Sequence, residues 1–374
     1  MKTLRNFSYS IAAFFVAVIF LTSCDENPDV APAQDLLPQN FSVDIPSTIS
    51  NANFVANGRA RGRVKEDSLK GNDIYELLGL FIAIGDESAQ LVEAIINGIR
   101  VHNIDRVLTL TYIGDDDGRE KNLVVTSNST FEGRTWEYEL LVTDADNEVN
   151  DDGGKAMQVF WNAGSPIEGI AILKPLNINV NEDETGDAIF RIDYSEDGSL
   201  GYEAHMDVRI SGLPLVSPLE DPFAISTIRL FAGKNGDVVD VYGNSNHPNA
   251  ILFAGETGFN WAFVASGNEV DDIGVAEVGL PPSDLNETSR SVLLEDYSVK
   301  NVFVNEITAV WPGIDPTILD PFLAETEAPG YFNSEGFISG GTSPGQPWDE
   351  LALRLDNLAP FNPVEVSNLQ VTFK

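Results

Sequence analysis

The chain holds few residues that could carry out hydrolytic or metal chemistry. Its three histidines, His102, His205 and His247, include no pair with metal-ligand spacing such as His-x-x-x-His. Residues 341–345, Gly-Thr-Ser-Pro-Gly, match the Gly-x-Ser-x-Gly pattern of hydrolase nucleophiles, which requires a helix directly after the serine. Pro344 follows this serine, and a proline disfavours helical geometry at the residue before it. We therefore predict a loop here, with no zinc site and no serine hydrolase.

Three acidic clusters supply carboxylates of the kind that bind hard cations. The richest contains four candidate Ca²⁺ ligands, Asp144, Asp146, Glu148 and Asp151. It departs from a calcium loop, because Val149 stands where the pattern requires glycine and the twelfth position is not glutamate. The other two clusters are Asp115–Asp117 and Glu182–Glu184. We predict solvated turns and no cofactor, with Ca²⁺ binding at millimolar concentration as the alternative.

Aromatic and amide side chains are candidates for ligand binding without catalysis. Trp311, Tyr331 and Trp348 lie in or beside a Pro/Gly-rich stretch at about 312–347, where rings have less reason to form a core. Asn246 and His247 lie in a polar segment, residues 243–249, which we predict to be a loop. Rings could stack on sugars or on an aliphatic ligand, and the amide and imidazole could bind a glycan. The alternatives are loop packing for the rings and a turn for the polar segment.

A hydrophobic leader ends at the only cysteine of the chain. Basic residues precede an apolar run at residues 11–21, which as a helix is about 16 Å long, half the thickness of a bilayer core. The run is therefore too short to be a membrane span. Leu21-Thr22-Ser23-Cys24 resembles the lipobox of bacterial lipoproteins. The resemblance implies that residues 1–23 are a signal peptide and that Cys24 carries thioether-linked diacylglycerol and an acylated amino terminus.

The residues after the cysteine predict where the protein is anchored. Asp25-Glu26-Asn27 is similar to the export signal of surface lipoproteins of the Bacteroidota. The similarity implies lipid anchoring in the outer membrane, with the cell surface favoured over the periplasmic face. Residues 24–40 contain three prolines among small and polar residues and are predicted to be a flexible tether. A single cysteine excludes an intramolecular disulfide.

The charge of the chain excludes some partners. Its 22 basic and 58 acidic residues give a net charge of −36, and removal of the leader takes away Lys2 and Arg5. Such a field repels nucleic acid and favours cations and cationic partners. We therefore expect no nucleic-acid binding. The alternative meaning of the charge is a surface adapted to salty water.

The elements that would position these residues are mostly strands. Apolar residues at helical spacing predict two successive helices within about 73–100, or one helix broken at Gly85. From Arg106 onward the period is two, most clearly at Tyr202–Ile210, which predicts a sheet with one wet face. A hairpin is predicted around Asn235-Gly236. Further strands are predicted at 41–49, 261–265, 273–278, 299–304, 351–355 and 366–373.

These patterns predict a mainly β fold formed by residues 41–374 as a single large domain. We expect an antiparallel, strongly curved sheet around an N-terminal helical hairpin, similar in order of elements to the half-barrels of periplasmic lipoprotein carriers. A two-sheet β-sandwich with a helical insertion is the alternative.

The function predicted from the sequence is that of an outer-membrane lipoprotein that binds a glycan or an apolar small molecule without catalysis. One alternative is an accessory or structural subunit of an outer-membrane protein complex. Another is a glycan-active hydrolase, because among 58 acidic residues some pair lies at catalytic separation by chance.

Overall fold

The computed structural model describes residues 40–50, 71–100, 107–181, 185–219, 221, 223–250 and 257–374. Several predicted features lie outside these residues, namely the leader, Cys24, the tether up to residue 39, His102 and the acidic cluster Glu182–Glu184. No described helix combines the length and the hydropathy that crossing a bilayer requires.

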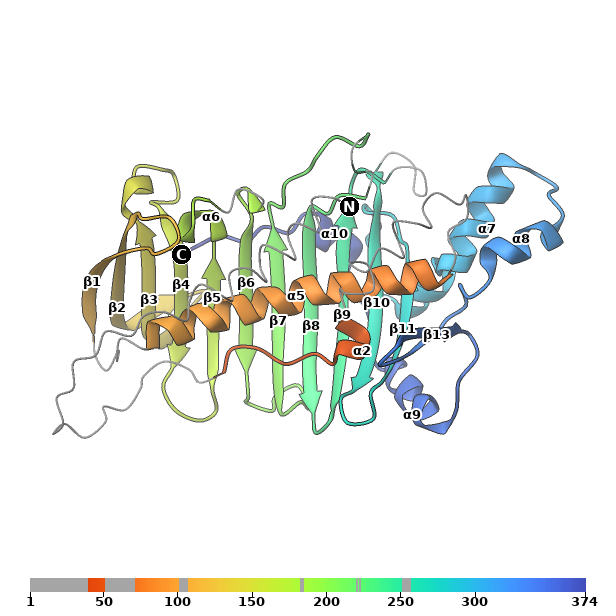
Figure 1. The fold of residues 1–374 in the computed structure, drawn as a ribbon, viewed down its shortest axis with the longest axis horizontal. Helices are drawn as coiled ribbons and strands as arrows, with labels where there is room; N and C mark the ends of the chain where they lie inside the picture. The colour runs from red at the N-terminus through yellow and green to blue at the C-terminus, as the bar shows by residue number, and fades with distance from the viewer. Residues whose placement is uncertain are drawn as a thin grey trace. The chain divides into compact units, whose positions relative to one another are not determined.

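The fold is mainly β, as predicted. The described strands form one open antiparallel sheet in which the strand order follows the sequence (Figure 1). The strands are β1 (Leu108–Ile113), β2 (Glu120–Phe131), β3 (Arg134–Asp144), β4 (Lys155–Asn162), β5 (Glu168–Leu173), β6 (Ile189–Ser195), β7 (Ala204–Ser211), β8 (Thr227–Asn235), β9 (Val238–His247), β10 (Phe259–Asn268), β11 (Ile273–Gly279), β12 (Gly330–Asn333) and β13 (Gly336–Gly340). The two-sheet sandwich is therefore wrong.

The predicted helical hairpin is a single helix. The described helices are α2 (Ser47–Ser50), α5 (Gly71–Arg100), η1 (Ala145–Asn147), α6 (Pro175–Ile178), η4 (Ser291–Asp296), α7 (Val299–Val310), α8 (Pro316–Leu323), α9 (Gln346–Leu355) and α10 (Pro363–Ser367). Helix α5 continues through Gly85, where a Cβ would lie 3.1 Å from Leu230 Cδ1. This glycine makes room for a side chain of β8 and does not break the helix.

Several short segments predicted as strands are helical. Residues 299–304 and 351–355 lie in α7 and α9, residues 366–373 begin in α10, and residues 41–49 form no strand. Short apolar runs do not distinguish strand from helix by periodicity alone. Ser298 and Asn362 cap α7 and α10 with their side chains. The predicted loop at 312–347 contains α8, β12, β13 and the start of α9. Pro316 and Pro347 do not prevent these helices, because they lie in first helical turns, where no N–H is needed.

Residues 41–374, predicted as one domain, group into two compact units. Unit 1 contains the described residues of 43–86 and 215–369, and unit 2 contains those of 40–42, 87–214 and 370–374. Helix α5 contributes its first half to unit 1 and its second half to unit 2.

In unit 1 both faces of the strands are covered, so nine of the ten residues of β10 are buried. On one face Phe81 of α5 packs edge-on against Trp261, with ring centroids 5.2 Å apart. On the other face Val264 joins a hydrophobic cluster with Leu351 and Leu355 of α9. The hairpin of β8 and β9 forms as predicted, with Gly236 at positive φ in its turn.

In unit 2 one face of the strands is apolar, and the other carries both a buried hydrophobic cluster and charged side chains. Phe41 stacks on Tyr194 on the apolar face, with ring centroids 5.9 Å apart, and a Cβ on Gly169 would clash with the Phe41 ring. On the other face Arg191 forms bidentate bonds to Glu132, as well as bonds to Asp193. The alternation predicted for 202–210 is confirmed in β7, whose buried and half-exposed residues alternate from Met206 onward.

Candidate functional site

Two of the predicted binding residues lie inside a strand and not in a loop. β9 extends to His247, so the polar segment predicted as a loop at 243–249 is mostly a fully paired inner strand. Side chains alternate along a strand, so Asn246 and His247 point to opposite faces of the sheet and cannot share a ligand. His247 faces α5, and Asn246 faces α10.

His247 forms a pair with Ser245 that has the geometry of a nucleophile and its base. Its Nδ1 lies 2.9 Å from the carbonyl oxygen of Phe223, an acceptor, so Nδ1 carries the proton and donates it. Nε2 is then an acceptor, and the Ser245 hydroxyl donates to it at 2.8 Å. Hydrolases use this arrangement to activate serine.

The pair is sealed from any substrate. Ser245 and His247 both have 0% exposure. The imidazole packs against three rings, those of Phe81, Phe259 and Trp261, with centroids 5.2 to 6.1 Å away. Burial lowers the pKa of His247 to about 4, although its bond to the Phe223 carbonyl raises it. The imidazole is therefore neutral at pH 7, and it joins β9 to the segment before β8.

On the opposite face, Asn246 belongs to a buried layer of amides and hydroxyls. Its Oδ1 accepts hydrogen bonds from Ser283 Oγ at 2.6 Å and from Ser367 Oγ of α10 at 3.2 Å. Its Nδ2 donates to Ser226 Oγ at 2.8 Å. Asn260 of the next strand donates to Ser367 Oγ at 3.0 Å. Helix α10 thus satisfies these polar groups and covers them.

The structure separates the three predicted aromatic residues. Tyr331 is 5% exposed and lies in the hydrophobic cluster beneath α9. Trp348 of α9 packs against the same cluster, and its indole N–H donates to the carbonyl of Phe332 at 2.8 Å. Trp311 follows α7 and is 62% exposed. The structure thus brings Tyr331 and Trp348 together in a packed layer, and Trp311 is the one exposed ring of the three.

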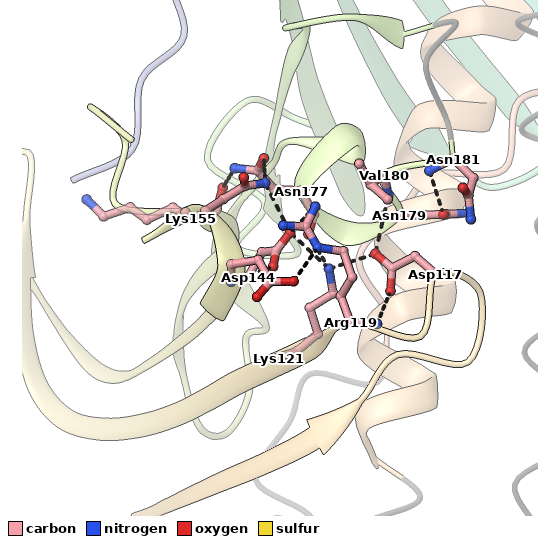
Figure 2. A network of polar contacts seen from close by, with 12 residues as sticks. Asp117, Arg119, Lys121, Asp144, Lys155, Asn177, Asn179, Val180 and Asn181 are labelled. Carbon is pink, nitrogen blue, oxygen red and sulfur yellow. Dashed lines mark hydrogen bonds and ion pairs between the residues drawn. The ribbon is translucent and has the colours of Figure 1, made fainter. Parts of the chain in front are cut away.

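The acidic turns of unit 2 surround a buried ammonium group of the protein itself. Lys121 is 2% exposed, and its Nζ lies 2.9 Å from Asp117 Oδ2, 3.4 Å from Asp144 Oδ2 and 2.9 Å from the Asn177 carbonyl oxygen. Arg119 adds a second cation 3.1 Å from Asp144. Figure 2 shows these side chains pointing toward one another.

Hydrogen bonds hold the Asp117 carboxylate in the charged form. Burial raises the pKa of Asp117, but bonds from Arg119 N, Lys121 and Val180 N outweigh this effect and hold the pKa below its ordinary value. Asp144 also accepts from the backbone N–H of Asp146, at the start of η1. Two carboxylates and a carbonyl around one charge are the donors a metal ion would use, and here an ammonium occupies the position.

The remaining calcium candidates have other partners or stand apart. Asp146 forms an ion pair with Arg119 at 3.1 Å, and Glu148 accepts from Asn122 at 2.9 Å. Asp151 is exposed. In the part of the chain that the structure describes, no group of three or more His, Cys, Asp or Glu side chains could hold a metal ion.

An open cleft in unit 1 was missed by sequence reasoning. We call it the α9 cleft. Its volume is about 430 Å³, and its lining comes from the turn ends of β9 to β11 and from α9. The lining residues are Val238, Asn268, Asp271, Ile273, Gln346, Pro347, Glu350, Leu351 and Arg354. Since these come from three distant segments, no local pattern could have indicated the cleft.

One wall of the α9 cleft is fixed by a bidentate ion pair. Arg354 donates through Nε and Nη2 to the two carboxylate oxygens of Asp240, at 2.9 and 2.6 Å. Ser266 Oγ donates to the same carboxylate at 2.8 Å. Asp240 is 5% exposed, whereas Arg354 is 35% exposed. A strand residue beneath the helix therefore orients a guanidinium that borders the cleft.

Comparison of the chain with models of protein families, with curated proteins and with solved structures gave no match.

The structural role of Lys121 is testable by replacement. In Lys121→Met, the buried side chains of Asp117 and Asp144 lose their contact with the ammonium group, and we expect the free energy of unfolding to fall by about 3–5 kcal/mol. Lys234→Met is the matched control, since Lys234 lies 3.8 Å from an exposed Glu269, and an exposed pair contributes at most about 1 kcal/mol.

Urea denaturation followed by circular dichroism measures both changes. Equal, small losses in the two variants would contradict the assigned role. Because the ammonium already occupies the position, we also expect that neither Ca²⁺ nor EDTA shifts the wild-type transition.

Proposed function

We propose that the protein is a lipid-anchored, non-catalytic glycan-binding protein of the outer membrane, displayed on the cell surface, with the glycan in the α9 cleft. The observation that supports this proposal is the mixed lining of the cleft. Asn268 and Gln346 offer amides, Asp271 and Glu350 offer carboxylates, and Arg354 offers N–H donors. A volume of about 430 Å³ lies within the usual range of ligand sites.

The chemistry of the lining suits a sugar. Each hydroxyl of a sugar both donates and accepts hydrogen bonds, so it pairs with amides, carboxylates and guanidinium alike. The ring C–H groups need an apolar surface, and Val238, Ile273 and Leu351 supply one within the same cleft. Planar polar groups around an apolar surface therefore favour a glycan over a purely apolar ligand.

Packing on the α5 face of unit 1 argues against the apolar-ligand alternative. A Cβ added to Gly274 would lie 2.5 Å from Ile49 Cγ2, and one added to Gly330 would lie 2.6 Å from the Tyr75 ring. The strand backbone at these two glycines therefore lies directly against Ile49 of α2 and Tyr75 of α5, which leaves no room for a ligand between them. The space that the sequence suggested for an apolar molecule is occupied there by the protein's own side chains.

Binding without hydrolysis is favoured by the environment of the cleft carboxylates. A glycosidase needs two carboxyls in different environments, one of them kept protonated as the acid. Asp271 and Glu350 are both exposed to solvent. The Ser245–His247 pair is buried. We therefore favour binding, and release of reducing sugar from a bound glycan would establish the hydrolase alternative.

A second candidate is the accessory subunit of an outer-membrane complex, favoured by strand β1. This strand is at the end of the strand order and contains no charged residue, and Val107, Leu110 and Ile113 beside or within it are exposed. Uncharged edge strands pair readily with another chain. A stoichiometric membrane protein recovered with this chain in a detergent pull-down would favour the subunit over the glycan-binding protein.

The lipid anchor is tested by Cys24→Ala. We expect wild-type protein in the membrane fraction with a mass raised by the acyl chains, and the variant in the soluble fraction without that mass, since several acyl chains hold a protein firmly on a bilayer. Membrane fractionation and mass spectrometry of the intact protein measure both. Retention of the variant in the membrane with unchanged mass would refute the anchor. Protease shaving of intact cells then reports which face displays the domain.

The glycan site is tested with a panel of immobilised oligosaccharides, followed by calorimetric titration of whichever oligosaccharide binds. We expect Gln346→Ala and Asp271→Asn each to weaken binding by about threefold to tenfold, the effect of losing one hydrogen bond. Glu335→Gln, an exposed residue in the β12–β13 turn, is the control and should leave affinity unchanged. Binding unaffected by both cleft variants, or absent for the whole panel, would contradict the proposal.

A further inference from the structure

A second cleft in unit 1 has apolar walls and acidic residues. We call it the η4 cleft. It has a volume of about 370 Å³ and is formed by η4, by α7 and by the segment that follows β11. Its lining residues are Leu280, Pro282, Leu285, Val292, Asp296, Tyr297, Val302, Asn305 and Glu306. Most of these side chains are apolar, and the only charges among them are two carboxylates.

The backbone that forms this cleft is unusual. η4 is a π-helix, a rare conformation that occurs frequently at functional sites. It is pressed so closely onto β11 that a Cβ added to Gly279 would lie 1.9 Å from the carbonyl oxygen of Leu293. Leu293 and Leu294 point into the core, which leaves Val292 and Asp296 of η4 to line the cleft. A glycine in the sheet therefore permits the close packing of the turn that presents Asp296.

The two carboxylates, those of Asp296 and Glu306, form no ion pair with a basic side chain in the described part of the chain. The basic residues that flank the walls are already paired, Arg290 with Glu277 at 2.7 Å and Lys300 with Glu327. The cleft thus differs from the acidic turns of unit 2, where Lys121 and Arg119 supply the positive charge.

We propose that the η4 cleft binds a lysine or arginine side chain of a basic polypeptide. Apolar walls accept the methylene stem of such a side chain, and Asp296 and Glu306 accept hydrogen bonds from its cationic end. The net charge of −36 attracts a basic partner over a longer range. This binding is independent of the glycan site, since the two clefts have no lining residue in common.

The probe is the peptide acetyl-Gly-Lys-Gly-Lys-Gly-amide, titrated into the whole mature protein and followed by methyl NMR signals of Val292 and Val302. We expect those signals to shift and saturate. The double variant Asp296→Asn/Glu306→Gln should weaken binding by about fivefold to twentyfold, as the product of two exposed charge pairs. The matched control, Asp320→Asn/Glu335→Gln, removes the same charge from exposed positions elsewhere and should retain the affinity.

Additional titrations distinguish the possible causes of binding. Equal weakening in both double variants would mean a general field effect and overturn the site. A peptide with norleucine in place of both lysines lacks the positive charge. If it bound with the same affinity as the lysine peptide, the role of the carboxylates would be overturned. Binding of n-pentylammonium without binding of the lysine peptide would overturn a polypeptide ligand. Thermal unfolding of each variant separates lost binding from lost fold, and Glu306→Gln alone serves if the double variant does not fold.

Discussion

Burial of the strands of unit 1 on both faces is the constraint on which the rest of the structure depends. Helices α2 and α5 cover one face, and α9 and α10 cover the other, so the polar side chains of β9 and β10 are buried. Each unsatisfied group would cost about 1–3 kcal/mol. His247 therefore pairs with Ser245 and Phe223, and Asp240 pairs with Arg354. Asn246 pairs with Ser367 of α10, with Ser283 and with Ser226. Groups that have the chemistry of catalysis are used here to join layers.

Burial also determines how charged side chains are paired in unit 2. A chain with a net charge of −36 repels itself, and its acidic turns need positive charge to pack. Lys121 and Arg119 supply it from β2 and from the turn before it. Acidic residues thus differ by environment: those around Lys121 are neutralised within the fold, whereas Asp296 and Glu306 border an open cleft, where no described basic side chain forms an ion pair with them. This difference separates the residues that stabilise the protein from those that are available to a partner.

The extent to which the sequence predicts this molecule follows from the same packing. One-sided strands have a period of two, so β7 and the β8–β9 hairpin are predictable. The second half of β9, residues 243–247, is predicted as a loop, because a strand buried on both faces and filled with Asn, Ser and His has the composition of a loop. Gly85, Pro316 and Pro347 look like helix breaks in the sequence, but Gly85 makes room for a neighbouring side chain, and the two prolines lie in the first turns of α8 and α9. The two clefts unite segments far apart in sequence, which no local pattern reveals.

The most direct test of internal pairing is the titration of His247, followed by NMR of the imidazole signals with His247→Gln as the assignment control. The structure predicts a pKa of about 4, against about 6.5 in the unfolded chain. The fold favours the neutral imidazole, so above pH 6.5 the titration of His247 does not lower the free energy of unfolding. As the pH falls from 6.5 to 4, His247 takes up a proton in the unfolded chain only, and the free energy of unfolding falls by about 3 kcal/mol in total. Reversible protonation of His247 near pH 6.5 in the folded protein would contradict a sealed Ser245–His247 pair and restore it as a candidate for catalysis.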